Sequence, residues 1–159
     1  YTAQRDPRMA VCVLKNGDVI KWNGEDVTIE TYIDGANGLE SNPSINLYTR
    51  TGYYFHKYIR PGTDPVNRYD AAPWKYFRLA EIKLNLAEAA VEHGDLTEAY
   101  NQVNDIRRRV GMPDLPAGLT QEELLLRVKN ERRVEMVYEE QRYFDIRRWI
   151  DEVDTETLK

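Results

Sequence analysis

Two adjoining stretches decide the fold: FRLAEIKLNLAEAAVEHG at residues 77–94 and DLTEAYNQVNDIRRRVG at residues 95–111. In the first stretch, polar residues recur at steps of three and four and leave apolar residues on nearly every other face; the polar residues are Arg78, Glu81, Asn85, Glu88 and Glu92. In the second stretch, one apolar stripe has the same step and consists of Leu96, Ala99, Val103, Ile106 and Val110. Because this step keeps side chains on one face of an α-helix, the sequence predicts helices near 75–93 and 95–110 that pack as an antiparallel hairpin.

The residues where the two stretches meet are typical of a helix end followed by a helix start. Gly94 suits the left-handed conformation that closes a helix, and Asp95 suits the N-cap of the next helix, with Glu98 able to bond back to the cap amide. The arginine run 107–109 then falls in the last turn, where cations interact favourably with the helix dipole. This helix-end interpretation of the arginines is preferred over a nucleic-acid site.

A third helix is predicted near 120–150. Thr120 and Glu123 stand at the two positions of a capping box, and apolar residues flank them as a hydrophobic staple. No glycine or proline follows before Trp149, so the pattern predicts one uninterrupted helix.

The predicted helices carry charged residues beside apolar ones, here called the charged seam: Arg78, Glu81, Glu88, Arg132, Glu135, Glu139 and Arg142. In the third helix their spacing predicts ion pairs within the helix. Glu135 and Glu139 are alternatively the acid/base pair of a hydrolase. A general acid, however, needs a desolvated carboxyl with a raised pKa, whereas each of these carboxylates has an arginine one turn away. A structural role is therefore preferred, and the chain is predicted not to be an enzyme.

The first part of the chain predicts small β elements joined by long loops. Residues 9–22, MAVCVLKNGDVIKW, have two β-rich runs around Asn16-Gly17, the strongest two-residue signal for a β-hairpin. This hairpin would place Cys12 in a strand. Residues 27–33 predict another short strand, and residues 35–73 predict an irregular stretch in which TGYYFHKYI is extended.

Three ordered motifs in the second part of the chain resemble the SusD/RagB family of outer-membrane nutrient-binding lipoproteins. They are RLAEIKLNLAEAAVEHGD at residues 78–95, AYNQVNDIRRRVGMP at residues 99–113 and ERRVEMVYEEQRYFDIRRW at residues 131–149. Upstream, DPRM at residues 6–9 and TGYYFHK at residues 51–57 are similar to two further family segments. The resemblance implies a mainly α SusD-like fold with a tetratricopeptide-like helical hairpin. Residues 1–75 would form the small β-hairpin and aromatic-rich loop region, and residues 76–159 the helical region, as parts of one domain.

The resemblance also implies a function and a location. Proteins of this family bind glycans at the outer-membrane cell surface of Bacteroidetes-type bacteria, through a lipid anchor, and deliver them to a SusC-like TonB-dependent transporter. Against the family pattern, the N-terminal half with its signal peptide and lipid-bearing cysteine is missing, as is the closing tail. The chain is therefore expected to be a fragment truncated at both ends. The alternative function is a helical-repeat scaffold that binds other proteins without binding sugar.

Charge and aromatic content point to an uncharged ligand for the first part of the chain. Residues 1–75 contain equal numbers of basic and acidic residues, so the net charge of −5 belongs to residues 76–159. A neutral, tyrosine-rich surface suits sugars better than phosphates, so no nucleic-acid partner is expected. Trp22, Tyr32 and Tyr48 are the carbohydrate-binding candidates, because each offers a flat apolar face with a polar edge and falls at a strand end or in a loop.

No metal or cofactor is expected. Cys12 is the only cysteine, which excludes an internal disulfide and a multi-cysteine metal site. His56 and His93 have no partner at the spacing of metal ligands.

Overall fold

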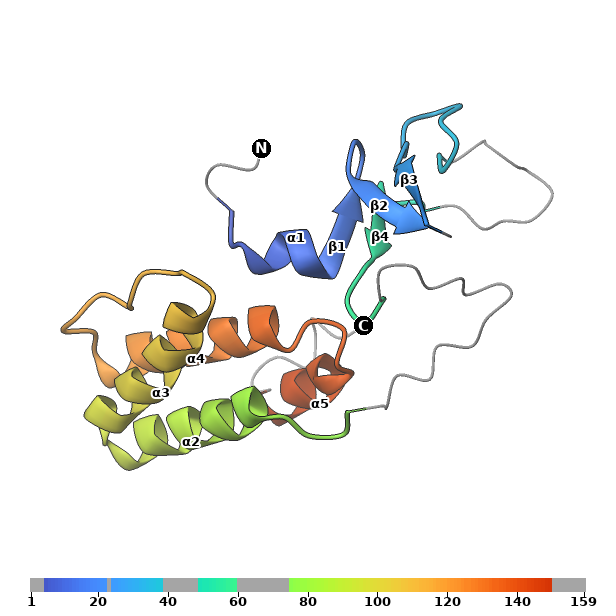
Figure 1. Cartoon of the computed structure of the whole chain (residues 1–159). Coiled ribbons are helices and arrows are strands. Elements are labelled where there is room, and N and C mark those ends of the chain that lie inside the picture. The colour runs from blue at the N-terminus through green and yellow to red at the C-terminus, as the bar shows by residue number, and fades with distance from the viewer. Residues whose placement is uncertain (1–4, 23, 39–48, 60–74, 150–159) are drawn as a thin grey trace. The chain divides into compact units, whose positions relative to one another are not determined.

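The computed structural model describes residues 5–22, 24–38, 49–59 and 75–149. They belong to two compact units, Tyr1–Trp74 and Lys75–Lys159, here called the N-terminal unit and the helical unit. Within these described ranges, the N-terminal unit holds a short helix and four short strands, and the helical unit holds α2 to α5 (Figure 1). This mainly helical structure with small antiparallel β pairs in its first part confirms the predicted fold class.

The helical unit begins with the predicted hairpin of α2 (Leu79–His93) and α3 (Leu96–Arg109). Gly94 ends α2 with φ 88° and donates its N–H to the carbonyls of Ala90 and Val91, as a left-handed C-cap does. The Asp95 carboxylate caps α3 by accepting the N–H of Glu98 at 3.1 Å. The Glu98 carboxylate accepts from Gln102 at 2.7 Å, so the predicted return bond to the cap is not seen.

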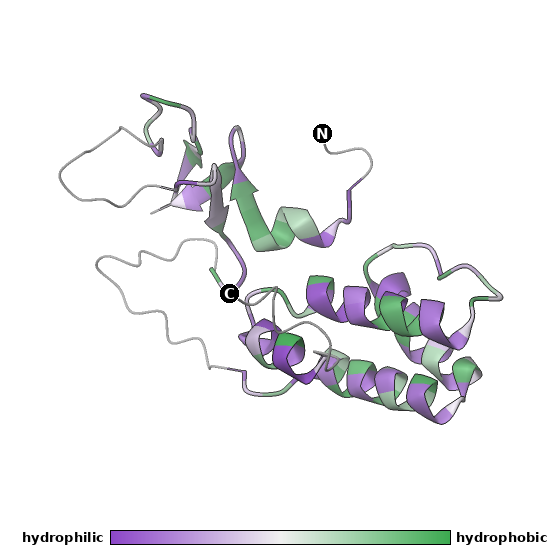
Figure 2. Cartoon of the chain, turned by 180° about the vertical axis from the view of Figure 1, so that it is seen from behind, coloured by the Kyte–Doolittle hydropathy of each residue, from purple (hydrophilic) through white to green (hydrophobic). Residues whose placement is uncertain are grey.

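The core of the helical unit lies where α2 packs on both α3 and α4 (Gln121–Glu135). Hydrophobic and hydrophilic residues alternate along these helices (Figure 2), and the buried members form one main cluster. That cluster consists of Ala87, Ala90, Val91, Ala99, Val103, Leu115, Leu124 and Val128. Thr120 and Glu123 form the complete predicted capping box at the start of α4, which brings Leu124 into the core.

The prediction of one helix over 120–150 is wrong. The chain ends α4 at Glu135, turns through residues with positive φ at Tyr138 (61°) and Glu140 (60°), and begins α5 (Gln141–Arg148). No glycine or proline marks this break, so the sequence pattern did not reveal it. The physical reason is a contact: Arg132 Nε lies 2.8 Å from Asp145 Oδ1. In a continuous helix, the rise over 13 residues would separate the two backbone positions by about 20 Å.

The described part of the N-terminal unit contains two separate antiparallel strand pairs. β1 (Val13–Lys15) pairs with β4 (Tyr53–Phe55), and β2 (Val19–Trp22) pairs with β3 (Glu25–Thr28). The prediction of one hairpin over residues 9–22 is therefore wrong, although the chain does turn at Gly17, where φ is 84°. At this turn the N–H of Gly17 donates to the carbonyl oxygen of Ile29 at 2.8 Å, which directs β2 toward β3. The edge of β1 is then left to pair with β4.

The residues before β1 form a helix, α1 (Arg8–Cys12), where a strand was predicted. Asp6 accepts the Arg8 N–H at 2.9 Å, and Pro7 follows it with a helical φ of −59°, so Asp-Pro starts a helical turn. Cys12 is consequently the last residue of α1, and it is buried. The Asp-Pro start signal outweighed the β propensity of the residues that follow.

The predicted strand over 27–33 ends early, at Thr28, and a braced loop follows it. Asn37 Oδ1 accepts the N–H of Glu30 at 3.1 Å, while Glu30 O accepts the N–H of Asn37 at 3.0 Å. A Cβ atom at position 38 would lie 1.8 Å from the carbonyl oxygen of Tyr32, so only glycine fits this close approach. None of the helices in the described ranges has both the length and the hydrophobicity that a transmembrane span requires.

Candidate functional site

The charged seam joins separate elements of the helical unit. Arg78, just before α2, donates to Glu135 and to Glu139, each at 2.6 Å. Arg109 of α3 reaches the same Glu135 oxygen at 2.5 Å. The predicted pairing within one helix is therefore wrong for these residues, and Glu135 and Glu139 each bind arginine from another part of the chain. This geometry holds the carboxylates in structural ion pairs and gives neither the environment of a general acid.

Arg132 is the most enclosed cation of the seam. Its Nε donates to Asp145 at 2.8 Å, with side-chain exposures of only 5% and 4%, and its Nη1 donates to Asn85 at 2.7 Å. Arg132 thereby ties α4 to both α5 and α2.

Glu88 joins α2 to the end of α5. It accepts two hydrogen bonds from the guanidinium of Arg148 and one from the indole N–H of Trp149 at 2.7 Å. Burial alone would raise the pKa of Glu88, but these hydrogen bonds outweigh burial and lower its pKa. The carboxylate is thus held ionised as a link between two helices.

Two predicted seam residues differ from the rest. Glu81 is buried, and within the described part of the chain its side chain forms no hydrogen bond or ion pair. Arg142 is exposed on α5 and lies over the Trp149 ring at 5.9 Å. Among the described residues Arg142 forms no ion pair, so the structure does not join it to the other residues of the seam.

The arginine run 107–109 ends α3 as predicted. Arg107 pairs with Glu131 at 2.8 Å, Arg108 pairs with Asp114, and Arg109 pairs with Glu135. Each guanidinium thus already has a carboxylate partner, which leaves a poor surface for phosphate.

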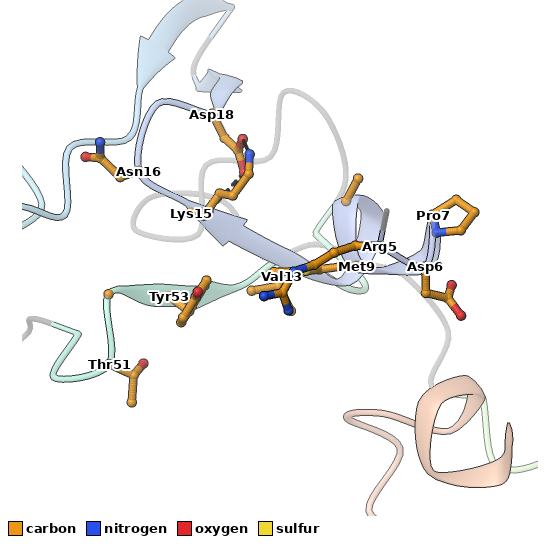
Figure 3. Close-up of a pocket in the computed structure, with 12 residues that line it drawn as sticks. Arg5, Asp6, Pro7, Met9, Val13, Lys15, Asn16, Asp18, Thr51 and Tyr53 are labelled. Carbon is orange, nitrogen blue, oxygen red and sulfur yellow. Dashed lines mark hydrogen bonds and ion pairs between the residues drawn. The ribbon is translucent and has the colours of Figure 1, made fainter. Parts of the chain in front are cut away.

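Two hollows of the N-terminal unit are the candidate ligand sites, and both use strand β1. The Tyr53 hollow (Figure 3) has a volume of about 470 Å³ and is lined by residues that include Arg5, Met9, Val13, Lys15, Asn16 and Tyr53. The Trp22 hollow has a volume of about 620 Å³, and its lining includes Leu14, Trp22, Ile29, Tyr54, Phe55 and His56. Because side chains alternate along a strand, Val13 and Lys15 face one hollow and Leu14 the other.

The Trp22 hollow combines apolar walls with a few polar groups. Of its lining residues, Leu14 and Ile29 are buried, and Trp22 is half-buried at the end of β2. The Nδ1 atom of His56 is buried and has no hydrogen-bond partner among the described residues. The Tyr54 hydroxyl donates to Asn37 O at 2.8 Å, so this tyrosine braces the loop and fixes one wall of the hollow. Such a mixture of apolar faces and sparse polar groups is typical of small-ligand sites.

The structure does not bring the three predicted aromatic residues together. Trp22 lines a hollow, whereas Tyr32 lies in the loop after β3, is 54% exposed and lines neither hollow. The pKa of Tyr32 is raised by the nearby negative charge of Glu30, so its hydroxyl stays protonated. Tyr48 lies outside the described residues. Sequence reasoning missed Tyr53 and Tyr54, although alternation along TGYY could have placed one on each face.

Comparison with known proteins decides the family. The sequence profile of the SusD family matches residues 2–159. The chain belongs to the SusD family. No curated protein matches the chain.

Solved structures agree with SusD family membership. A SusD-like protein from Bacteroides fragilis NCTC 9343 is 36% identical with a TM-score of 0.77, and the match covers 93% of this chain and 28% of that one. A SusD superfamily protein from Bacteroides vulgatus ATCC 8482 is 24% identical with a TM-score of 0.60, over 91% of this chain and 29% of that one, and shows the fold alone. The chain thus spans less than a third of the length of these relatives.

Membership of the SusD family bears on catalysis. SusD family proteins are non-catalytic binding proteins, in agreement with the prediction that this chain is not an enzyme.

Among the described residues, no three metal-ligating side chains gather into a possible metal site.

Proposed function

We propose that the protein containing this chain binds glycans at the cell surface and delivers them to a SusC-like TonB-dependent transporter, without catalysis. The observation that carries this proposal is the SusD family match over residues 2–159. The same membership supports attachment of the whole protein to the outer membrane through a lipid anchor. The transporter is accordingly the protein partner that we expect.

The Trp22 hollow supports binding of an uncharged sugar within this chain. A pyranose presents an apolar C–H face and a rim of hydroxyl groups, which match an indole face and nearby hydrogen-bonding groups. The Trp22 indole N–H makes no hydrogen bond to the described residues, and His56 Nδ1 is equally unused. We therefore propose Trp22 as a glycan contact, while Tyr32 and Tyr48 stay candidates from the sequence.

Calorimetric titration with neutral oligosaccharides tests the proposal. The panel contains maltohexaose, xylohexaose, laminarihexaose and mannohexaose, which differ in sugar and linkage. We expect at least one to bind, and Trp22→Ala to weaken it about tenfold through loss of the stacking face. Tyr76→Ala is the matched control, because Tyr76 is an exposed aromatic residue of the helical unit. Absence of binding across the panel would contradict glycan binding by this chain.

An interaction scaffold is the second candidate, favoured by the outer face of α2. Leu79, Ile82 and Leu86 are spaced by three and four residues and are 69%, 54% and 45% exposed. This apolar stripe is suited to packing against another helix, as neighbouring hairpins do in helical-repeat proteins. Co-purification of the whole protein with a transporter, together with no response to any oligosaccharide, would favour this function.

A further inference from the structure

The Tyr53 hollow lies on the face of the β1 and β4 strand pair that carries Val13 and Lys15 (Figure 3). The Trp22 hollow uses Leu14 and Tyr54, the residues that alternate with them. The two hollows are therefore distinct. A ligand in the Trp22 hollow would not contact Tyr53, which lines only the Tyr53 hollow.

The backbone of Tyr53 is held in place from two sides. Within the sheet, Tyr53 is the partner of Lys15 in β1. On the other side, Thr49 Oγ1 accepts the Tyr53 N–H at 3.2 Å and donates to the Tyr53 carbonyl at 2.7 Å. The position of the Cα atom, and hence the root of the side chain, is thus fixed before any ligand arrives.

The side chain of Tyr53, in contrast, has no structural partner. Among the described residues it forms no hydrogen bond, ion pair or ring contact, and Tyr53 is 43% exposed. Tyr54, its neighbour in β4, uses its hydroxyl to brace the loop. An aromatic residue whose backbone is held in place and whose ring is engaged by no other group is suited to ligand contact, because the backbone is already ordered and the ring gives up no structural partner when the ligand binds.

The chemistry of the Tyr53 hollow favours a neutral, hydroxyl-bearing ligand. Met9 and Val13 give it an apolar floor. The lining carries two basic residues, Arg5 and Lys15, and two acidic residues, Asp6 and Asp18, so its charges balance. Lys15 pairs with Asp18, and Asp6 binds Arg8 at 2.6 Å. Such neutralised pairs offer hydrogen bonds to hydroxyl groups without attracting phosphate or carboxylate. A volume of about 470 Å³ falls within the range of small-ligand sites.

We propose that the Tyr53 hollow is a second saccharide subsite, which takes one neutral pyranose unit with its C–H face on the Tyr53 ring. This inference rests on the proposed function and adds a site and a contact residue to it. The Tyr53 hydroxyl and the paired charges at the rim supply the hydrogen bonds to the sugar. The subsite is independent of Trp22, so each aromatic residue contributes separately to the affinity of an oligosaccharide.

The test is calorimetry on the chain with the best oligosaccharide of the panel. We expect Tyr53→Ala and Tyr53→Leu to lower its affinity about tenfold, and Tyr53→Trp to retain it, since a flat aromatic face is what the sugar needs. Tyr76→Ala is again the matched control and should leave affinity unchanged. Circular dichroism establishes that each variant is folded, and the leucine variant, which keeps apolar bulk in the strand, serves if the alanine variant does not fold.

The outcomes separate this inference from the proposed function. Binding by the parent that Tyr53→Ala and Tyr53→Leu leave intact overturns the subsite alone. Loss of binding in Tyr53→Trp as well as in Tyr53→Leu would overturn the stacking role. No binding by the parent to any oligosaccharide overturns both the subsite and glycan binding by this chain.

Discussion

At the scale of single residues, the buried charges of the helical unit act as links between elements. Glu88 is enclosed between α2 and the end of α5, where Arg148 and Trp149 occupy its oxygens. Glu135 is shared by Arg78 and Arg109 in the same manner. A carboxylate in such a position is fully committed to hydrogen bonds with cations, and removal of its charge leaves those partners unsatisfied.

The lowered pKa of Glu88 predicts a specific loss of stability in acid. A carboxylate whose folded-state pKa lies below its ordinary value of 4.5 stabilises the fold fully above that value. The stabilisation is lost as the pH falls through the folded-state pKa, where the carboxylate takes up a proton. We therefore expect the parent to be more stable than Glu88→Gln at neutral pH, and the difference to shrink below about pH 4.5.

Thermal unfolding of the parent and Glu88→Gln between neutral and acid pH measures this effect. Glu92→Gln provides the control, since Glu92 is an exposed carboxylate of the same helix. A difference between parent and Glu88→Gln that stays constant down to strongly acid pH would show that the ionised form of Glu88 does not stabilise the fold.

At the scale of elements, local signals determined the helix ends that could be predicted. Gly94 and the capping box of Thr120 act within a single turn, so the residues around them were sufficient to place α2, α3 and the start of α4. The break after Glu135 has a distant cause, the contact between Arg132 and Asp145, and no local residue announces it. The strand pairing was predicted wrongly for the same reason: β1 pairs with a strand that is distant in sequence and begins at Tyr53.

The break between α4 and α5 can be tested with a glycine substitution. The expected change in the free energy of unfolding has the opposite sign if the two helices are one continuous helix. Glu140 has φ 60°, a conformation that costs a non-glycine residue about 1 to 2 kcal/mol. Glycine adopts it freely, at the expense of a more flexible unfolded chain, so Glu140→Gly should raise the free energy of unfolding by about 0.5 kcal/mol. Inside a continuous helix, Glu140→Gly would instead lower the free energy of unfolding by about 0.8 kcal/mol.

Urea unfolding of Glu140→Gly and of Arg127→Gly compares the two situations directly. Arg127 is exposed in the interior of α4, where glycine should destabilise by about 0.8 kcal/mol. Two variants that are destabilised by equal amounts would argue that residues 120–150 form one helix after all.

At the scale of the whole molecule, the ion pairs that join helices and the proposed ligand contacts belong to different units. The ion pairs that join separate helices lie in the helical unit, whereas both hollows lie in the N-terminal unit. The sequence could predict this division in outline, because the net charge is confined to residues 76–159 and most aromatic residues precede them. It could not predict the hollows themselves, since these depend on the pairing of β1 with β4. Of the two contacts proposed above, the sequence therefore suggested Trp22 and not Tyr53.

This division predicts that stability and glycan affinity respond to different substitutions. Arg132→Ala leaves the buried Asp145 carboxylate without its main partner, which should lower the free energy of unfolding by about 3 to 5 kcal/mol. Arg142→Ala is the matched control on an exposed arginine and should change it by no more than about 0.5 kcal/mol. Measured well below its unfolding temperature, Arg132→Ala should bind the oligosaccharide as tightly as the parent. Equal stability of the two variants would contradict the buried position of Arg132, and weaker binding by folded Arg132→Ala would place the helical unit in the ligand site.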